Sequence, residues 1–139
     1  MSFDLVLFGG TGDLCWRKLM PALFQAFQHG TLPEGARIIG VGRDDLSDER
    51  YRAQIHARFD QVELAKRPNP EEFARFSSLL EFVSMDLSKP EHYIYLRDKL
   101  AQRQSDTVVM YLATAPTLFT TIAEQLAIAG LNTTHTRVV

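Results

Sequence analysis

The sequence is poor in cysteine, in long hydrophobic stretches and in excess charge of either sign. Its single cysteine, Cys15, excludes an internal disulfide framework and is typical of a protein from a reducing compartment. No stretch approaches the roughly 20 apolar residues that span a bilayer, and the first residues lack the basic region of a signal peptide. A formal net charge of −2 and a pI of about 6.1 argue against a general binder of nucleic acids or acidic membranes. We therefore expect a cytoplasmic protein.

Internal repeats and low-complexity segments are absent as well, and 139 residues are enough for one domain with a single core. A hydrophobic content of 45% and a charged content of 23% are ordinary for a globular protein. The phosphate loop G-x-x-x-x-G-K-[ST] does not occur, because no glycine directly precedes Lys18 and Leu19 follows it. ATP hydrolysis is therefore not expected.

The strongest local signal that is present is a glycine-rich turn after a short apolar run. Residues 5–8 are continuously apolar, as in a strand that is covered on both faces. The glycines within residues 9–12 allow a tight turn, and helix formers follow at residues 14–27. This order of elements directs backbone N–H groups and the positive end of a helix dipole toward a pyrophosphate. Cys15 stands where the G-x-G-x-x-G fingerprint has its third glycine or alanine, and the alternative is a plain turn that joins strand to helix.

Strand and helix signals alternate along the whole chain. This order predicts a Rossmann-like α/β fold, a doubly wound parallel sheet with helices on both faces, truncated after the fifth strand. Pro21 predicts either a kinked first helix or a separate turn before the main helix. Further strands are expected at residues 37–42, 82–85, 107–112 and 137–139, and further helices at residues 47–66, 71–80, 90–104 and 116–129.

In such sheets, ligands bind beyond the carboxyl ends of the strands, where the strand order reverses. We therefore expect the functional residues at positions 9–13, at Arg43, at Asp86 and at positions 113–116. Each of these positions directly follows a predicted strand.

The residues after the second strand indicate which dinucleotide is bound. Arg43 can pair with a 2′-phosphate through a charge-assisted contact, which favours NADP. Asp44 or Asp45 can instead accept a hydrogen bond from a ribose hydroxyl, as in proteins that bind NAD. We predict NADP as the cofactor, with NAD as the alternative.

Residues 8–23, FGGTGDLCWRKLMPAL, resemble the opening signature of the glucose-6-phosphate dehydrogenase family, whose pattern is approximately FGxxGDLxxRKLxPxL. The resemblance continues at residues 38–43, 85–87, 111–116 and 131–139, so it extends over essentially the whole chain. This long signature is much more specific than a glycine fingerprint alone.

The resemblance implies a role for each matching position. Residues 9–14 would wrap the cofactor's phosphates, and Arg43 would bind the 2′-phosphate and stack beside the adenine. Residues 86–87 would border the adenine pocket, and residues 111–113 would line the channel toward the nicotinamide. Lys18 would lie near the nicotinamide and assist binding of the sugar phosphate. The implied cofactor-binding set is Gly9, Gly10, Thr11, Gly12, Asp13, Leu14, Arg43, Asp86, Leu87, Tyr111, Leu112 and Ala113.

Several of these residues also fit purely structural roles. Asp13 fits a helix N-cap, Asp86 a plain turn residue, Tyr111 a core position and Lys18 a solvated helix lysine. No metal site is expected.

The sequence departs from the family pattern at Cys15, at Trp16, which replaces a frequent basic residue, and at Ala115, which replaces a frequent proline. The family's segments E-K-P-x-G and H-Y-L-G-K do not occur; residues 92–96 are only superficially similar to the second. No histidine–carboxylate pair is available as the base that oxidation of a hydroxyl requires. No catalytic residue is therefore assigned.

The resemblance thus implies the NADP-binding domain, residues 1–139, of an enzyme that oxidises glucose 6-phosphate to 6-phosphogluconolactone in the pentose phosphate pathway. The catalytic domain would be absent, so the fragment should be inactive, whereas the full-length enzyme should form a homo-oligomer. Two alternatives remain open at this stage. One is a non-catalytic dinucleotide-sensing module, and the other is a reductase with a Tyr-x-x-x-Lys pair, for which Tyr95 and Lys99 have the spacing.

Overall fold

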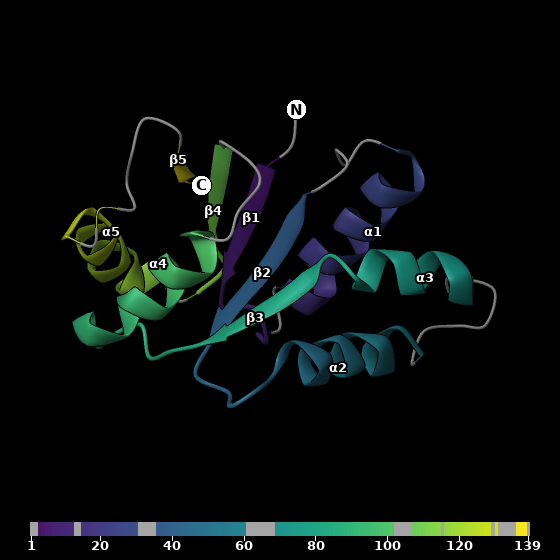
Figure 1. Cartoon of the computed structure of the whole chain (residues 1–139), viewed down its shortest axis with the longest axis horizontal. Helices are drawn as coiled ribbons and strands as arrows, with labels where there is room; N and C mark the ends of the chain where they lie inside the picture. Colours follow the sequence, from purple (N-terminus) through teal and green to yellow (C-terminus); the bar gives the residue numbers. More distant parts are fainter. Residues whose placement is uncertain are drawn as a thin grey trace.

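A five-stranded parallel sheet forms the centre of the molecule, in the order β3-β2-β1-β4-β5 (Figure 1). The computed structural model describes residues 3–12, 15–30, 36–60, 69–101, 107–114, 116–128, 130 and 136–138. Its strands are β1 (Phe3–Phe8), β2 (Arg37–Gly42), β3 (Leu80–Ser84), β4 (Thr107–Leu112) and β5 (Thr136–Val138). The chain runs outward from β1 to β3 and then crosses back to β4. The strand order therefore reverses between β1 and β4, which confirms the doubly wound sheet.

Helices cover both faces of this sheet (Figure 1). One face carries α1 (Met20–Gln28), α2 (Asp48–Asp60) and α3 (Pro70–Ser77), and the other carries α4 (Tyr93–Ala101) and α5 (Phe119–Ile128). Among the described residues, no helix has the length and apolarity that a membrane crossing requires.

Alternation along β1 divides the core between the two faces. Leu5 and Leu7 pack in the cluster formed with α1, α2 and α3, whereas Val6 and Phe8 pack in the cluster formed with α4 and α5. All four side chains are buried, and each contributes about 1.5–3 kcal/mol relative to an exposed position. Burial on both faces explains why residues 5–8 of this strand are continuously apolar.

The segment after the glycine turn forms two elements. Residues Cys15–Leu19 form one π-helical turn, and α1 follows with Pro21 in its first turn. Proline is tolerated there, because the first N–H groups of a helix have no partner within it. The residues before Pro21 thus form a turn of a different helical type, which continues directly into α1 because Leu19 itself is in the helical conformation.

The third strand was expected at residues 82–85, but β3 begins two residues earlier, at Leu80, and ends one residue earlier, at Ser84. Leu80 has the helical spacing of Phe73 and Phe76, so the sequence assigned it to the preceding helix. Instead α3 ends at Ser77, and Leu80 pairs with Ile38 of β2. Tertiary pairing overrides the helical periodicity at this point.

The strands at residues 37–42 and 107–112 have the predicted bounds, whereas β1 begins two residues and β5 one residue earlier than predicted. The helices expected at residues 90–104 and 116–129 each begin with a 3₁₀ turn, Pro90–His92 and Pro116–Leu118, before α4 and α5. The N–H of Arg50 donates to Ser47 Oγ at 3.2 Å, which confirms the expected cap of α2. The predicted ends of the helices beyond Asp60 and Ala101 lie outside the described residues.

The free edge of β3 is closed by side chains of α2. The Phe82 N–H donates to Asp48 Oδ1 at 2.7 Å, and Arg52 Nε donates to the Leu80 carbonyl at 2.8 Å. An unpaired strand edge is a template for association with other chains. These two contacts occupy backbone groups of that edge.

Candidate functional site

A cavity of about 470 Å³ lies at the carboxyl ends of the central strands, where the strand order reverses. It is lined by Gly9, Thr11, Gly12, Val41, Gly42, Arg43, Asp44, Asp86, Leu87, Ser88, Ala113, Thr114 and Leu118. The positions expected after β1, β2, β3 and β4 therefore meet around one space, as the topology predicts.

Glycine is required at the turn after β1 because the backbone there is tightly surrounded. Gly9 has φ of +88°, and a Cβ on it would lie 2.7 Å from the Ala113 carbonyl oxygen. A Cβ on Gly10 would lie 2.6 Å from the Gly40 Cα. Both contacts are shorter than van der Waals packing permits, so only glycine fits these two positions.

The glycine amides of this turn are used within the protein. The N–H groups of Gly9 and Gly10 both donate to the Val41 carbonyl, at 2.8 and 3.0 Å, and the Gly12 N–H donates to the Gly9 carbonyl at 2.9 Å. Among residues 9–12, this leaves the Thr11 N–H as the amide that meets no carbonyl of the described chain. The glycines therefore give the turn its shape, and among residues 9–12 the Thr11 N–H is the backbone donor that a ligand can use.

Tyr51 of α2 lies beneath the turn and was not assigned a role from the sequence. Its hydroxyl donates to the Gly10 carbonyl at 2.9 Å, and its ring fills the space that a Cβ on Gly40 would need. Burial, followed by contact with the Cys15 thiol, raises the pKa of Tyr51. Helical spacing with Ile55 and Phe59 is a signal of burial, but it does not reveal contact with Gly10.

Cys15 packs in the same core cluster, in agreement with a packing role at the position of the third fingerprint glycine. Its side chain is fully buried, and this burial raises the pKa of the thiol to about 11 despite the Tyr51 hydroxyl beside it. A thiol of this kind is inert, because the thiolate is the reactive form.

The turn after β2 places one cation and one carboxylate on the cavity. Arg43 and Asp44 both line it, and both are exposed. The Thr11 hydroxyl donates to Asp44 Oδ1 at 2.9 Å. Of the two aspartates considered from the sequence, Asp44 borders the cavity and Asp45 does not.

The turn after β3 is held from both sides. Asp86 Oδ1 accepts from the Ser88 hydroxyl at 2.6 Å and from the Ser88 N–H at 2.9 Å. These contacts, the hydroxyl first, lower the pKa of Asp86, and the charge of Arg43 acts in the same direction. The Asp86 N–H donates to His92 Nδ1 at 2.8 Å, and Tyr93 donates to the Leu87 carbonyl at 2.9 Å. His92 therefore supports this turn.

The remaining predicted residues divide into three groups. Ala113 lines the cavity, and its N–H donates to the Phe8 carbonyl at 2.9 Å. Gly10 lies behind the turn, whereas Tyr111 and Leu112 pack against the two core clusters; none of these three lines the cavity. Lys18 is exposed in the π-helical turn and is not among the lining residues. Asp13, Leu14 and Ala115 lie outside the described residues.

Comparison with known proteins decides the family. The family model described as "Glucose-6-phosphate dehydrogenase, NAD binding domain" matches residues 6–139. The chain belongs to the glucose-6-phosphate dehydrogenase family. The resemblance carried by residues 8–23 is thereby confirmed.

Curated members of the glucose-6-phosphate dehydrogenase family match almost the whole chain. The chain is 41% identical over 140 residues to a glucose-6-phosphate 1-dehydrogenase of Mycolicibacterium smegmatis and 36% identical over 137 residues to one of Rhizobium meliloti. These matches span 98% and 99% of this chain but 28% of each relative. The chain thus corresponds to less than a third of the length of either relative.

Solved structures of the glucose-6-phosphate dehydrogenase family share the fold. The glucose-6-phosphate 1-dehydrogenase of Mycobacterium avium superposes with a TM-score of 0.84 at 29% identity, over 99% of this chain and 29% of its own. A glucose-6-phosphate dehydrogenase in complex with its substrate glucose-6-phosphate superposes with a TM-score of 0.81 at 26% identity, over the same shares of the two chains. The Rossmann-like fold class is therefore confirmed, and the family supports nicotinamide dinucleotide binding.

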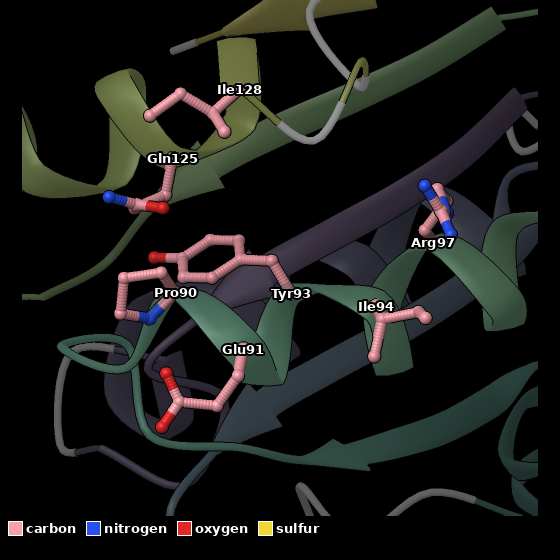
Figure 2. Close-up of a pocket in the computed structure, with 7 residues that line it drawn as sticks. All are labelled: Pro90, Glu91, Tyr93, Ile94, Arg97, Gln125 and Ile128. Carbon is pink, nitrogen blue, oxygen red and sulfur yellow. The ribbon is translucent and has the colours of Figure 1, made fainter.

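Other candidate sites on this family member lie apart from the cavity. A second cavity of about 300 Å³ lies between α4 and α5 and is lined by Pro90, Glu91, Tyr93, Ile94, Arg97, Gln125 and Ile128. Figure 2 shows Gln125 and Ile128 coming from α5, with Glu91 turned away from Gln125. None of its lining residues was predicted as a site residue. Among the described residues, no group of three or more histidines, cysteines and carboxylates is arranged to hold a metal ion.

The Tyr95–Lys99 pair does not form a reductase site. Lys99 Nζ lies 3.2 Å from Asp48 and 3.1 Å from Glu81, so its charge is used in ion pairs. Tyr95 is 51% exposed, and neither residue lines the cavity at the strand ends.

Proposed function

We propose that this chain is the NADP-binding domain of a glucose-6-phosphate dehydrogenase and that NADP binds in the cavity at the strand ends. The observation that carries the proposal is the meeting of the glycine turn and Arg43 around one space. The turn supplies a close backbone approach for a diphosphate, and Arg43 supplies a cation for the 2′-phosphate.

The cavity fits a dinucleotide by shape and by donors. A Cβ on Gly12 would lie 3.1 Å from the Gly9 carbonyl oxygen. Glycine at this position therefore leaves room for a ligand beside that carbonyl. The Thr11 N–H is a donor suited to a phosphate oxygen, and Leu87 and Leu118 are apolar lining residues suited to an adenine. In this assignment residues 9–14 hold the phosphates, and residues 86–87 border the adenine.

Arg43 supports NADP over NAD. Within the described chain its guanidinium makes no hydrogen bond or ion pair, which leaves it available to a 2′-phosphate. Asp44, the residue suited to an NAD ribose, already accepts a hydrogen bond from Thr11. NAD remains an alternative ligand, because Asp44 lines the cavity and a carboxylate has a second oxygen that can accept a hydrogen bond.

The complete protein is proposed to oxidise the C1 hydroxyl of glucose 6-phosphate, which yields 6-phosphogluconolactone. Bound NADP supplies the hydride acceptor. The role of this chain is to bind and orient that cofactor, with Ala113 of the cavity lining toward the nicotinamide and Lys18 toward the sugar phosphate. Full-length protein is proposed to be a homo-oligomer, as expected from the resemblance.

The described chain offers no evident base for that reaction. No histidine lines the cavity, and its two carboxylates, Asp44 and Asp86, accept hydrogen bonds from Thr11 and Ser88. Because the family's segments E-K-P-x-G and H-Y-L-G-K do not occur in the sequence either, we assign removal of the proton from the substrate hydroxyl to residues beyond this chain.

Calorimetric titration with NADP and with NAD tests the proposal. We expect saturable binding of one NADP per chain, with a lower Kd than for NAD. With glucose 6-phosphate and NADP together, no NADPH absorbance should develop. Absence of NADP binding would contradict the cofactor assignment, and turnover would contradict the assignment of the base to residues beyond this chain.

A further inference from the structure

We propose that Tyr51 is a positioning residue that orients the Gly10–Thr11 peptide so that the Thr11 N–H faces the dinucleotide. The inference rests on the proposed function, because it concerns how the proposed site presents its donor. Tyr51 lies on α2, away from the cavity lining, and acts through the backbone of the turn.

Three contacts place the Tyr51 hydroxyl firmly against the turn. It donates to the Gly10 carbonyl at 2.9 Å, in a buried environment. The Cys15 thiol is its second partner. Its ring packs against Phe82 at a centroid distance of 4.9 Å and occupies the space left by the missing side chain of Gly40. With a fully buried side chain, Tyr51 has little freedom to move away.

Because a peptide unit is planar, the hydrogen bond to the Gly10 carbonyl also fixes the direction of the Thr11 N–H. Gly10 contributes the C=O and Thr11 the N–H of a single peptide unit. In a trans peptide these two groups point in opposite directions, and no peptide bond among the described residues is cis. Because Tyr51 holds the carbonyl toward the buried side, the Thr11 N–H is turned away from α2. Thr11 itself lines the cavity.

The turn needs this restraint because glycine does not restrain itself. Gly10 has no Cβ, so its ψ angle is less restricted than that of any residue with a side chain. Its own N–H is held by the Val41 carbonyl, but its carbonyl accepts from Tyr51. The Thr11 N–H is the donor of residues 9–12 without a carbonyl partner in the described chain, so its orientation decides what the turn offers to a phosphate.

The test compares two ligands in Tyr51→Phe. This variant retains the ring and removes only the hydroxyl. NADP carries the diphosphate, whereas adenosine 2′-monophosphate carries the adenosine and the 2′-phosphate without it. Loss of one buried hydrogen bond to the turn should raise the Kd for NADP about tenfold. The Kd for adenosine 2′-monophosphate should stay within about twofold of that of the unsubstituted protein.

A control variant separates positioning from general destabilisation. Ile55→Val removes one methyl group from the same buried face of α2, one turn after Tyr51, and leaves the Gly10 contact intact. We expect it to lower the Tm without changing either Kd. Equal NADP affinity of Tyr51→Phe and unsubstituted protein would overturn the inference, as would an equal loss for both ligands.

A measurement on the unsubstituted protein keeps the inference falsifiable should Tyr51→Phe not fold. In NMR spectra, NADP should shift the Thr11 amide resonance more than those of Gly9 and Gly10, whose N–H groups donate to Val41. Larger shifts at Gly9 and Gly10 than at Thr11 would overturn the inference while leaving NADP binding intact. Failure of the unsubstituted protein to bind NADP would instead remove the proposed function, and this inference with it.

Discussion

The Thr11 hydroxyl donates a 2.9 Å hydrogen bond to Asp44 Oδ1 and so joins the glycine turn after β1 to the turn after β2. Both residues line the cavity, next to Arg43. The contact therefore brings a carboxylate to the place proposed for the 2′-phosphate. The described lining holds the carboxylates Asp44 and Asp86 and a single guanidinium, so cofactor preference depends on how these charges are balanced.

Replacement of Asp44 by asparagine should strengthen NADP binding. The amide oxygen can still accept from Thr11, but the negative charge beside the 2′-phosphate is lost. Removal of one like charge at a solvent-exposed site is worth about 0.5–1 kcal/mol, or a two- to fivefold lower Kd for NADP. Calorimetry at low salt measures the effect.

The control for this substitution is Asp45→Asn, which removes the same charge next door but outside the cavity lining. It should leave the Kd for NADP nearly unchanged. Equal effects of the two substitutions would show that general charge, rather than the position of Asp44, controls affinity.

Gly9→Ala should destabilise the fold strongly. A residue with a Cβ resists the φ of +88°, and the added Cβ would meet the Ala113 carbonyl oxygen at 2.7 Å. We expect a loss of about 2–4 kcal/mol in the free energy of unfolding, from the left-handed conformation and the overpacking together. Urea unfolding measures it.

Gly30→Ala separates these two causes. Gly30 also has positive φ, at +71°, but an added Cβ there would meet no atom within 4 Å. This control should lose only about 1 kcal/mol, the conformational part. If both variants lose the same stability, crowding at Ala113 contributes nothing.

The buried thiol and phenol predict loss of stability in alkali. Burial raises the pKa of Cys15 from 9.0 to about 11 and also raises the pKa of Tyr51. Between pH 9 and about pH 11, the unfolded chain releases the Cys15 thiol proton while the folded protein keeps it, so ionisation of the thiol favours unfolding. The contribution of the protonated thiol to the free energy of unfolding is fully present below pH 9 and is lost as the pH rises toward 11.

For Cys15 this loss amounts to about 3 kcal/mol over the whole interval. Urea unfolding at a series of pH values should show the decline, and Cys15→Ala should make its slope shallower. An unchanged slope in that variant would contradict the assignment to Cys15.

The sequence predicts the fold well where periodicity and topology act together. The strands at residues 37–42 and 107–112 have the predicted bounds because clusters of β-branched and other apolar residues lie between turn signals. The position of Leu80 is ambiguous in the sequence. Its spacing from Phe73 and Phe76 fits a helix, and its apolar side chain also fits a buried strand. Only pairing with Ile38 resolves that ambiguity, and such pairing is not visible in local sequence.

The same division applies to the cavity. Arg43 and Asp86 line one cavity because the carboxyl ends of parallel strands share one edge of the sheet, and this proximity is predictable from the order of the elements. The use of the Gly9 and Gly10 amides by Val41 was not predicted, since it depends on the distance between two strands. Tyr51 was missed for a similar reason: its contact with Gly10 joins residues 41 positions apart and requires the space beside Gly40.

The most direct test of the central claim, that this cavity holds a 2′-phosphorylated dinucleotide, is titration of Arg43→Ala with NADP and NAD. Loss of a charge-assisted contact to the 2′-phosphate should raise the Kd for NADP about 10- to 100-fold and leave the Kd for NAD within about twofold. Arg50→Ala, which removes the same charge from an exposed site outside the cavity lining, should change neither. An Arg43→Ala protein that binds NADP as tightly as the unsubstituted protein would contradict the claim.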